Sequence, residues 1–356
     1  MRLILTTEQQ ELAGAVRSFL ASAAPIARVR QVVEGEESYD RKTWDRLAGE
    51  LGVTGLAIPE EYGGEGAGHA EVAVVLEELG AALTPVPYFA SSVLAAEALL
   101  ALGDEDAKRE YLPGIAAGTT VATLSFGEGV TASADHTLDG RAERVLYGAD
   151  ADLILVVASL DGKPAVFAVP GEAVRRTPLE VMDLTRPQAA VEFEGTPARL
   201  VGSADATRAL ERTLDVAGAV LASEQLGGLR RCLDTIVEYA KLRVQFGRFV
   251  GSFQGVKHRL ADLHCLLEQS ESIARYSAWA ADEAPQEMPQ AAALAQAYVG
   301  PAYFRVAKEH LLLHGGIGFT WEHDAHFYYK RAKSSELLLG PGRHHRALLA
   351  ERLGLV

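Results

Sequence analysis

The chain has 356 residues, of which 48% are hydrophobic and 23% charged, so its composition is that of a globular protein with a sizeable core. Its formal net charge of −14 at pH 7 disfavours nucleic acid and anionic lipid as partners. Two cysteines without metal-type spacing favour a reducing compartment. Neither a signal-peptide pattern nor a membrane-spanning pattern is evident, so we expect a soluble, cytoplasmic protein that does not cross a membrane.

Helical patterns fill the first third of the chain. Thr6 and Gln9 form a capping-box signature before the first apolar periodicity. Gly52 ends the helical stretch "YDRKTWDRLAGELG", and Gly103 with Asp104 predicts the end of one helix and the start of the next. The intervening "VTGLAIPEEYGGEGAG" is a loop, because a helix does not cross such a Gly- and Pro-rich stretch.

The period changes from 3.6 to 2 near Val121, where short runs of Val, Leu and Phe separated by turn residues predict strands. From Thr207 the chain is helical again. The sequence therefore predicts a helical domain at residues 1–118, a β-domain at 119–204 and a C-terminal helical bundle at 205–356.

The stretch "RVQFGRFVGSFQ", residues 243–254, interrupts two long helical patterns. It combines two arginines, three phenylalanines and two glycines. One interpretation is an ordinary helix–helix turn with apolar plugs, and the other is a corner that holds a cofactor.

The layout and three stretches resemble the acyl-CoA dehydrogenase family of flavoproteins. The stretches are "LGVTGLAIPEEYGGEG", "YAKLRVQFGRFVGSFQGVKHRLADL" and "LLLHGGIGFTWEHDAHFYYKRAK". The resemblance covers the whole chain. It implies a mainly α fold with a small β-domain: an N-terminal helical domain, a β-barrel-like middle domain and a C-terminal four-helix bundle.

The resemblance also implies FAD as the cofactor. Arg243 offers a fork of donors to phosphate, Phe246 an aromatic surface and Gln254 a polar edge. Gly315 and Gly316 allow backbone N–H groups close to phosphate. In the family these two segments act on one FAD from neighbouring subunits, which implies an oligomer. In the alternative interpretation Arg243 caps a helix and Phe246 is a core residue.

The β-domain departs from the family pattern. In "TLSFGEGVTASADH", Gly127 stands where a flavin-contacting threonine is expected, although Glu128 is retained. The Gly-Ser-Asp run and the tryptophan of the following strand are missing. Ser125 is the candidate flavin contact in this stretch.

The usual catalytic base is absent as well. The family places a glutamate before a glycine in the last helical segment, where this chain has Leu339 before Gly340. Other members carry it on the helix before the Arg–Phe motif, where this chain has Ala217, or Gly218 with a shift of one residue.

Glu224 is the candidate base, because it follows Ala217 by two helical turns and lies in an apolar stretch that would raise its pKa. Alternatively, Glu224 pairs with Arg230 or Arg231, or lies at a subunit interface. Glu336 is a weaker candidate, and Asp215 faces elsewhere on the helix.

Two histidine clusters complete the candidates. His323, Asp324 and His326 are too closely spaced for one helical face, so we expect no metal site. His344 and His345 are expected at a solvated helix start rather than at phosphate.

The resemblance implies an FAD-dependent acyl-CoA dehydrogenase, an oxidoreductase that introduces an α,β double bond into an acyl-CoA thioester and passes electrons to a flavoprotein acceptor. The rival interpretation is a non-catalytic companion subunit that shares FAD with a paralogous chain. The chain would form a homo-oligomer or a hetero-oligomer with that paralogue. A flavin oxidase or monooxygenase on the same scaffold is a third possibility.

Overall fold

The computed structural model describes residues 3–356, apart from the side chains of residues 127 and 128, and the chain divides into two compact units. The first unit comprises Met1–Ala27, Ala73–Thr84 and Gly218–Val356, and the second comprises Arg28–Val72 and Pro85–Ala217. Three helices contribute residues to both units: α2 (Ile26–Val33), α4 (His69–Ala82) and α7 (Thr207–Leu242).

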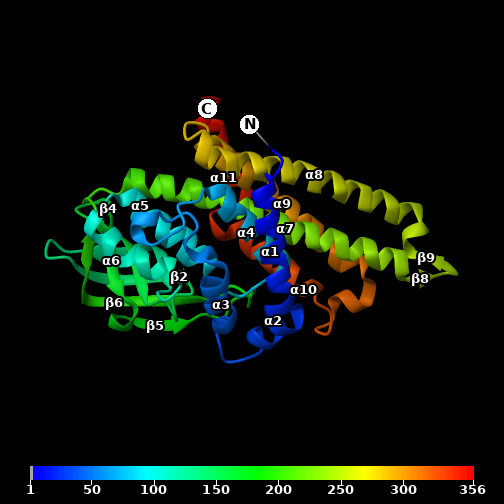
Figure 1. Cartoon of the computed structure of the whole chain (residues 1–356), viewed down its shortest axis with the longest axis horizontal. Helices are drawn as coiled ribbons and strands as arrows, with labels where there is room; N and C mark the ends of the chain where they lie inside the picture. Colours follow the sequence, from blue (N-terminus) through cyan, green and yellow to red (C-terminus); the bar gives the residue numbers. More distant parts are fainter. Residues whose placement is uncertain (1–2) are drawn as a thin grey trace. The chain divides into compact units, whose positions relative to one another are not determined.

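In the described part of the second unit, a seven-stranded sheet has the strand order β5-β6-β2-β1-β3-β4-β7. β1 and β3 pair in parallel, and the other neighbours pair antiparallel. Figure 1 shows this sheet as arrows coloured from cyan to green. Its strands are β1 (Ala122–Ala132), β2 (Thr137–Leu146), β3 (Leu153–Leu160), β4 (Lys163–Pro170), β5 (Arg175–Pro178), β6 (Gln188–Pro197) and β7 (Arg199–Val201).

The core of the sheet is formed by large apolar side chains from four strands. Leu138, Val145, Ile154, Phe167 and Phe193 are each at most 2% exposed. Complete burial of such a side chain stabilises the fold by roughly 1.5–3 kcal/mol. The predicted change to a strand period after residue 121 is therefore confirmed.

Short helices complete the second unit. α3 (Arg41–Leu51) is capped by Asp40 and ends at Gly52, whose φ of 65° favours glycine. The indole N–H of Trp44 donates to the carbonyl of Gly118 at 2.9 Å. The remaining helices are α5 (Ala96–Leu102), α6 (Glu105–Ala116), the π-helix η3 (Phe89–Ala95) and the 3₁₀ turns η1 (Val53–Gly55), η2 (Glu60–Tyr62) and η4 (Gly171–Ala173).

The first unit is helical and centres on a bundle. α9 packs against α8, α10 and α11. Within the bundle, the side-chain amide of Gln296 donates to the Gly218 carbonyl at 2.7 Å, and that of Gln225 donates to the Ser335 carbonyl at 3.1 Å. The helices are α1 (Thr7–Ala23), α8 (Gln254–Glu283), α9 (Met288–Leu313), α10 (Ala325–Leu338) and α11 (Gly342–Arg352), with the 3₁₀ turns η5 (Val250–Ser252) and η6 (Gly315–Phe319).

The predicted fold class, mainly helical with a small sheet and a C-terminal four-helix bundle, is confirmed. The capping box at Thr6 is formed as expected, with reciprocal hydrogen bonds to Gln9 of 3.1 and 3.2 Å. Gly103 ends α5 with a φ of 70°, and Asp104 caps α6. Among the helices of the described residues, none combines the length and apolar character that crossing a bilayer requires.

Glycines set the approach of α4 to α7 within the first unit. A Cβ atom on Gly227 would lie 1.8 Å from the Glu77 carbonyl oxygen, and one on Gly80 would lie 2.1 Å from the Glu224 carbonyl oxygen. Both distances are impossible for real atoms, so the two backbones approach closely only because neither glycine carries a side chain.

We expect the substitution Gly227→Ala to lower the free energy of unfolding by about 1–3 kcal/mol, because the helices must separate to admit the methyl group. Gly14→Ala in α1 is the matched control, since nothing lies within 4 Å of its added Cβ. This control should stabilise the chain by about 0.5–1 kcal/mol through helix propensity. Urea titration of both variants measures the difference, and equal stabilities would contradict the packing argument.

Candidate functional site

The predicted corner at residues 243–254 is a tight hairpin between α7 and α8. β8 (Val244–Gln245) pairs with β9 (Arg248–Phe249), and the turn consists of Phe246 and Gly247 with φ of 51° and 75°. Positive φ at both central residues is the hairpin geometry that matches strand twist. The amide of Val250 donates to the Arg243 carbonyl at 2.7 Å and closes the corner.

The corner presents its side chains to solvent. Phe246 is 92% exposed, so its interpretation as a core residue is wrong. Arg243 and Gln254 are exposed too, and Arg243 has no ion-pair partner among the described residues. Arg248, which no sequence motif singled out, stacks its guanidinium 3.9 Å from the ring centroid of Phe253. The guanidinium of Arg243 and the ring of Phe246 are thus accessible to a ligand.

The predicted glycine loop, residues 315–319, is also accessible to solvent at its two leading glycines. Gly315 has a φ of 67°, and an added Cβ atom on Gly315 or Gly316 would meet nothing within 4 Å. Both residues are exposed, at the start of η6. Their backbone groups are therefore accessible to a phosphate-bearing ligand, as the two consecutive glycines predict.

Ser125 belongs to the second unit and, unlike the corner and the glycine loop, is buried. It is 1% exposed, and its hydroxyl has no hydrogen-bond partner among the described residues. A buried hydroxyl without a partner costs free energy, so its environment suits a bound group that would supply one. The neighbouring positions Gly127 and Glu128 lie outside the residues whose side chains are described.

Glu224 lies inside the bundle and is paired. Its carboxylate is 3.2 Å from the guanidinium of Arg331, and the Ser335 hydroxyl is 3.4 Å away. Glu224 and Arg331 are each 4% exposed. The alternative that Glu224 is an ion-paired residue fits this geometry, but its partner is Arg331 of α10 and not Arg230 or Arg231. Arg230 instead pairs with acids on other helices.

The two positions where the family places its base carry no acid here. Leu339 follows α10 and is partly buried, and Ala217 is completely buried. His345 is 7% exposed, so its expected place at a solvated helix start is wrong, whereas His344 is exposed as expected. Burial and the nearby His344 lower the pKa of His345 to about 4.

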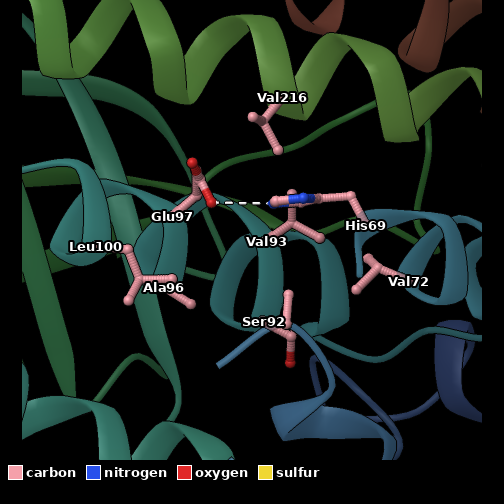
Figure 2. A pocket seen from close by; sticks show the side chains of 9 residues that line it. His69, Val72, Ser92, Val93, Ala96, Glu97, Leu100 and Val216 are labelled. Atoms are coloured by element: carbon pink, nitrogen blue, oxygen red, sulfur yellow. Dashed lines mark hydrogen bonds and ion pairs between the residues drawn. The ribbon is translucent and has the colours of Figure 1, made fainter. Parts of the chain in front are cut away.

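A polar pair in the second unit was not predicted. The His69 ring nitrogen lies 3.2 Å from one oxygen of the Glu97 carboxylate, and Arg212 lies 3.2 Å from the other. The dashed line in Figure 2 marks the His69–Glu97 contact. The pair borders a pocket of about 10 Å³, room for about one water molecule. Apolar side chains such as Val93 and Val216 form much of its wall. His69 and Glu97 are 28 positions apart, so no local pattern could have joined them.

A histidine cluster lies around the start of the glycine loop. The ring of His314 is 4.7 Å from that of His310 and 4.2 Å from that of His323. Burial lowers the pKa of His310 to about 3, with smaller contributions from His314, His323 and Arg231. Burial likewise lowers the pKa of His314. Among the side chains that the structure describes, no three His, Cys, Asp or Glu residues are placed to hold a metal ion.

We expect the free energy of unfolding to fall as the pH drops below 6.5. Unfolded histidine binds a proton near pH 6.5 whereas folded His310 does not, so the unfolded state gains protons first. The loss is at most about 1.4 kcal/mol per pH unit for each such histidine, until the folded pKa is reached. His310→Leu should make the pH dependence shallower. Urea titrations between pH 7.5 and 4.5 measure both slopes, and identical slopes would contradict the assignment.

Known proteins match both the sequence and the fold. The family described as "Acyl-CoA dehydrogenase, N-terminal domain" matches residues 6–119, and "Acyl-CoA dehydrogenase, C-terminal domain" matches residues 206–354. Acyl-CoA dehydrogenase IpdE2 of Mycobacterium tuberculosis is 37% identical over 350 residues, which are 97% of this chain and 97% of that protein.

Two solved structures extend this similarity to the fold. A chain of the ChsE4-ChsE5 complex from Mycobacterium tuberculosis superposes with a TM-score of 0.92 at 30% identity, covering 100% of both chains. A variant of the Tcur3481-Tcur3483 steroid ACAD has a TM-score of 0.87 at 30% identity and 98% coverage of both chains. The chain therefore belongs to the acyl-CoA dehydrogenase family, whose members are flavin-dependent oxidoreductases that act on CH–CH bonds.

Proposed function

We propose that this chain binds FAD and acts in the α,β-dehydrogenation of an acyl-CoA thioester, with a second flavoprotein as electron acceptor. Family membership supports the reaction class. The observation that carries the cofactor assignment is the exposed corner of Arg243 and Phe246, together with the open backbone at Gly315 and Gly316. Gln254 belongs to the same corner, and the Ser125 hydroxyl of the second unit, which has no hydrogen-bond partner among the described residues, is proposed separately as a flavin contact. These residues fit a ligand that carries both phosphate and aromatic rings.

We further propose that the chain works as an oligomer in the cytoplasm, with three domains divided near residues 118 and 204. Large apolar side chains are exposed on the first unit near the corner and in the glycine loop. An apolar set of this kind is typical of a surface that a partner covers. It comprises Leu242 (75% exposed), Val244 (48%), Phe249 (54%), Ile317 (47%), Phe319 (66%) and Trp321 (67%).

Two versions of the function differ in the proton acceptor. The bound flavin supplies the hydride acceptor, and removal of the α-proton falls to a protein side chain. In the self-sufficient enzyme this acceptor is Glu224. In the companion-subunit version a paralogous chain supplies it, and the Glu224–Arg331 pair is structural. The buried ion pair supports the companion version, because Glu224 is already paired with Arg331, and protonation of the carboxylate would remove a negative charge that faces a buried guanidinium.

Arg243→Met tests the cofactor assignment. We expect the Kd for FAD to rise about 10- to 100-fold, because a charge-assisted contact to phosphate is lost. Arg305→Met, which removes an exposed guanidinium from α9, is the matched control and should leave the Kd unchanged. Flavin absorbance of the purified protein and fluorescence titration of the apoprotein provide the measurements. Equal affinities in the two variants would reject the corner as the FAD site.

Glu224→Gln alone does not separate the two versions, since breaking the buried pair destabilises the fold by about 3–5 kcal/mol in either case. The double variant Glu224→Met with Arg331→Met removes both charges and should recover most of that stability. If Glu224 is the base, turnover stays at least about 100-fold low in the double variant. If the pair is structural, turnover recovers with stability.

The chain is assayed alone and after co-expression with a paralogous chain, because the companion version predicts flavin retention and turnover only in the pair. Substrates begin with steroid-derived thioesters, given the similar steroid ACAD, followed by straight and branched acyl-CoA thioesters. Anaerobic bleaching of the flavin bands by a thioester in the isolated chain would support the self-sufficient enzyme.

A further inference from the structure

Tyr239 lies in the last turn of α7, next to the corner of residues 243–254. Its carbonyl accepts a hydrogen bond from the amide of Arg243 at 2.9 Å. This bond ties the position of Arg243 to the final turn of the helix. Any displacement of Tyr239 is therefore transmitted directly to the backbone that carries the Arg243 side chain.

The same tyrosine reaches the glycine loop. Its hydroxyl donates to the carbonyl of His314 at 3.3 Å, and its ring lies 4.5 Å from the His314 ring. His314 immediately precedes Gly315, whose positive φ redirects the chain into η6. Tyr239 thus contacts both proposed FAD-binding segments, through its backbone carbonyl at the corner and through its side chain at the residue before the glycine loop.

His314 is itself firmly held. It is 4% exposed, its Nδ1 atom lies 2.7 Å from the His310 carbonyl, and the rings of His310 and His323 pack on it. The loop folds back over His314, because a Cβ atom on Gly318 would lie 3.0 Å from the His314 Cβ and 2.3 Å from the Leu311 carbonyl oxygen. Only glycine permits that approach, so Gly318 allows the loop to pack closely against His314.

We infer that Tyr239 and His314 form a positioning joint, which holds the Arg243 corner and the Gly315–Gly316 backbone of one chain at a fixed separation, so that each of these proposed FAD-binding segments is in place before FAD arrives. This inference rests on the proposed function. Neither residue is assigned a contact with FAD. Their contribution is preorganisation, since a binding site whose parts are held in place loses less conformational entropy when a ligand arrives.

Tyr239→Phe removes the hydroxyl and retains the ring, whereas Tyr239→Leu removes both. Tyr276→Phe is the matched control, because it removes a tyrosine hydroxyl that bonds Glu287 on the same unit, away from the loop. Each variant is compared by amide hydrogen exchange of residues 315–319 in flavin-free protein, by the Kd for FAD and by Tm.

We expect faster exchange of residues 315–319 and a roughly 3- to 10-fold higher Kd for FAD in Tyr239→Phe, with larger effects in Tyr239→Leu. Tyr276→Phe should change neither. A merely structural role would lower Tm and accelerate exchange throughout the bundle rather than in the loop. Loop exchange and FAD affinity that stay at the wild-type level in Tyr239→Leu would overturn the inference.

The two proposals fail in distinguishable ways. Wild-type protein that binds no FAD, alone or with a paralogous chain, would reject the proposed function and with it the purpose of the joint. FAD binding that is normal in wild type and insensitive to Tyr239→Leu would reject the joint alone. Loop exchange in the flavin-free protein reports on the joint in both situations.

Discussion

The end of α7 is the constraint on which the arrangement of the proposed cofactor site depends. A helix of 36 residues stops at Leu242, and the chain reverses in a two-residue turn before α8 begins. The turn places Phe246 at positive φ and leaves its ring in solvent. Positive φ in a non-glycine residue costs roughly 1–2 kcal/mol, and an exposed aromatic ring recovers none of it by burial. The rest of the fold carries this cost in the isolated chain, and the proposed dinucleotide or second subunit would add contacts to the exposed ring.

Buried acidic side chains in the first unit are paired with arginines. Glu77 is largely buried, and burial raises its pKa although Arg275 and Arg230 act to lower it. The acid is nevertheless bracketed by guanidinium groups at 2.6 and 3.5 Å. The Glu224–Arg331 pair repeats this pattern at a second position along α7. Buried ion pairs are costly to break but add little to the net free energy of unfolding. Their main effect here is to specify which faces of the helices pack together.

The sequence predicted the fold wherever a local pattern decided the outcome. The capping box at Thr6, the end of α3 at Gly52 and the start of α7 at Thr207 follow from chemistry within one helical turn. Long-range neighbours were the failures. Arg331 lies 107 positions from Glu224, and the burial of His345 depends on how α11 folds back, so neither was accessible from periodicity. The candidate cofactor contacts at the corner were identified because they belong to a local sequence motif and do not depend on tertiary packing. Their roles stay predictions.

The missing base is best understood from the surroundings that an effective base requires. A carboxylate that removes a proton must be close to the substrate and must exist part of the time without a competing cation. Glu224 meets a guanidinium deep in the bundle, and Leu339 and Ala217 have no ionisable group at all. The flavin-binding candidates, by contrast, are all preserved in open or partnerless form. Exposed candidates for holding a cofactor, beside a carboxylate that is paired with a cation, are what the proposed companion version would require.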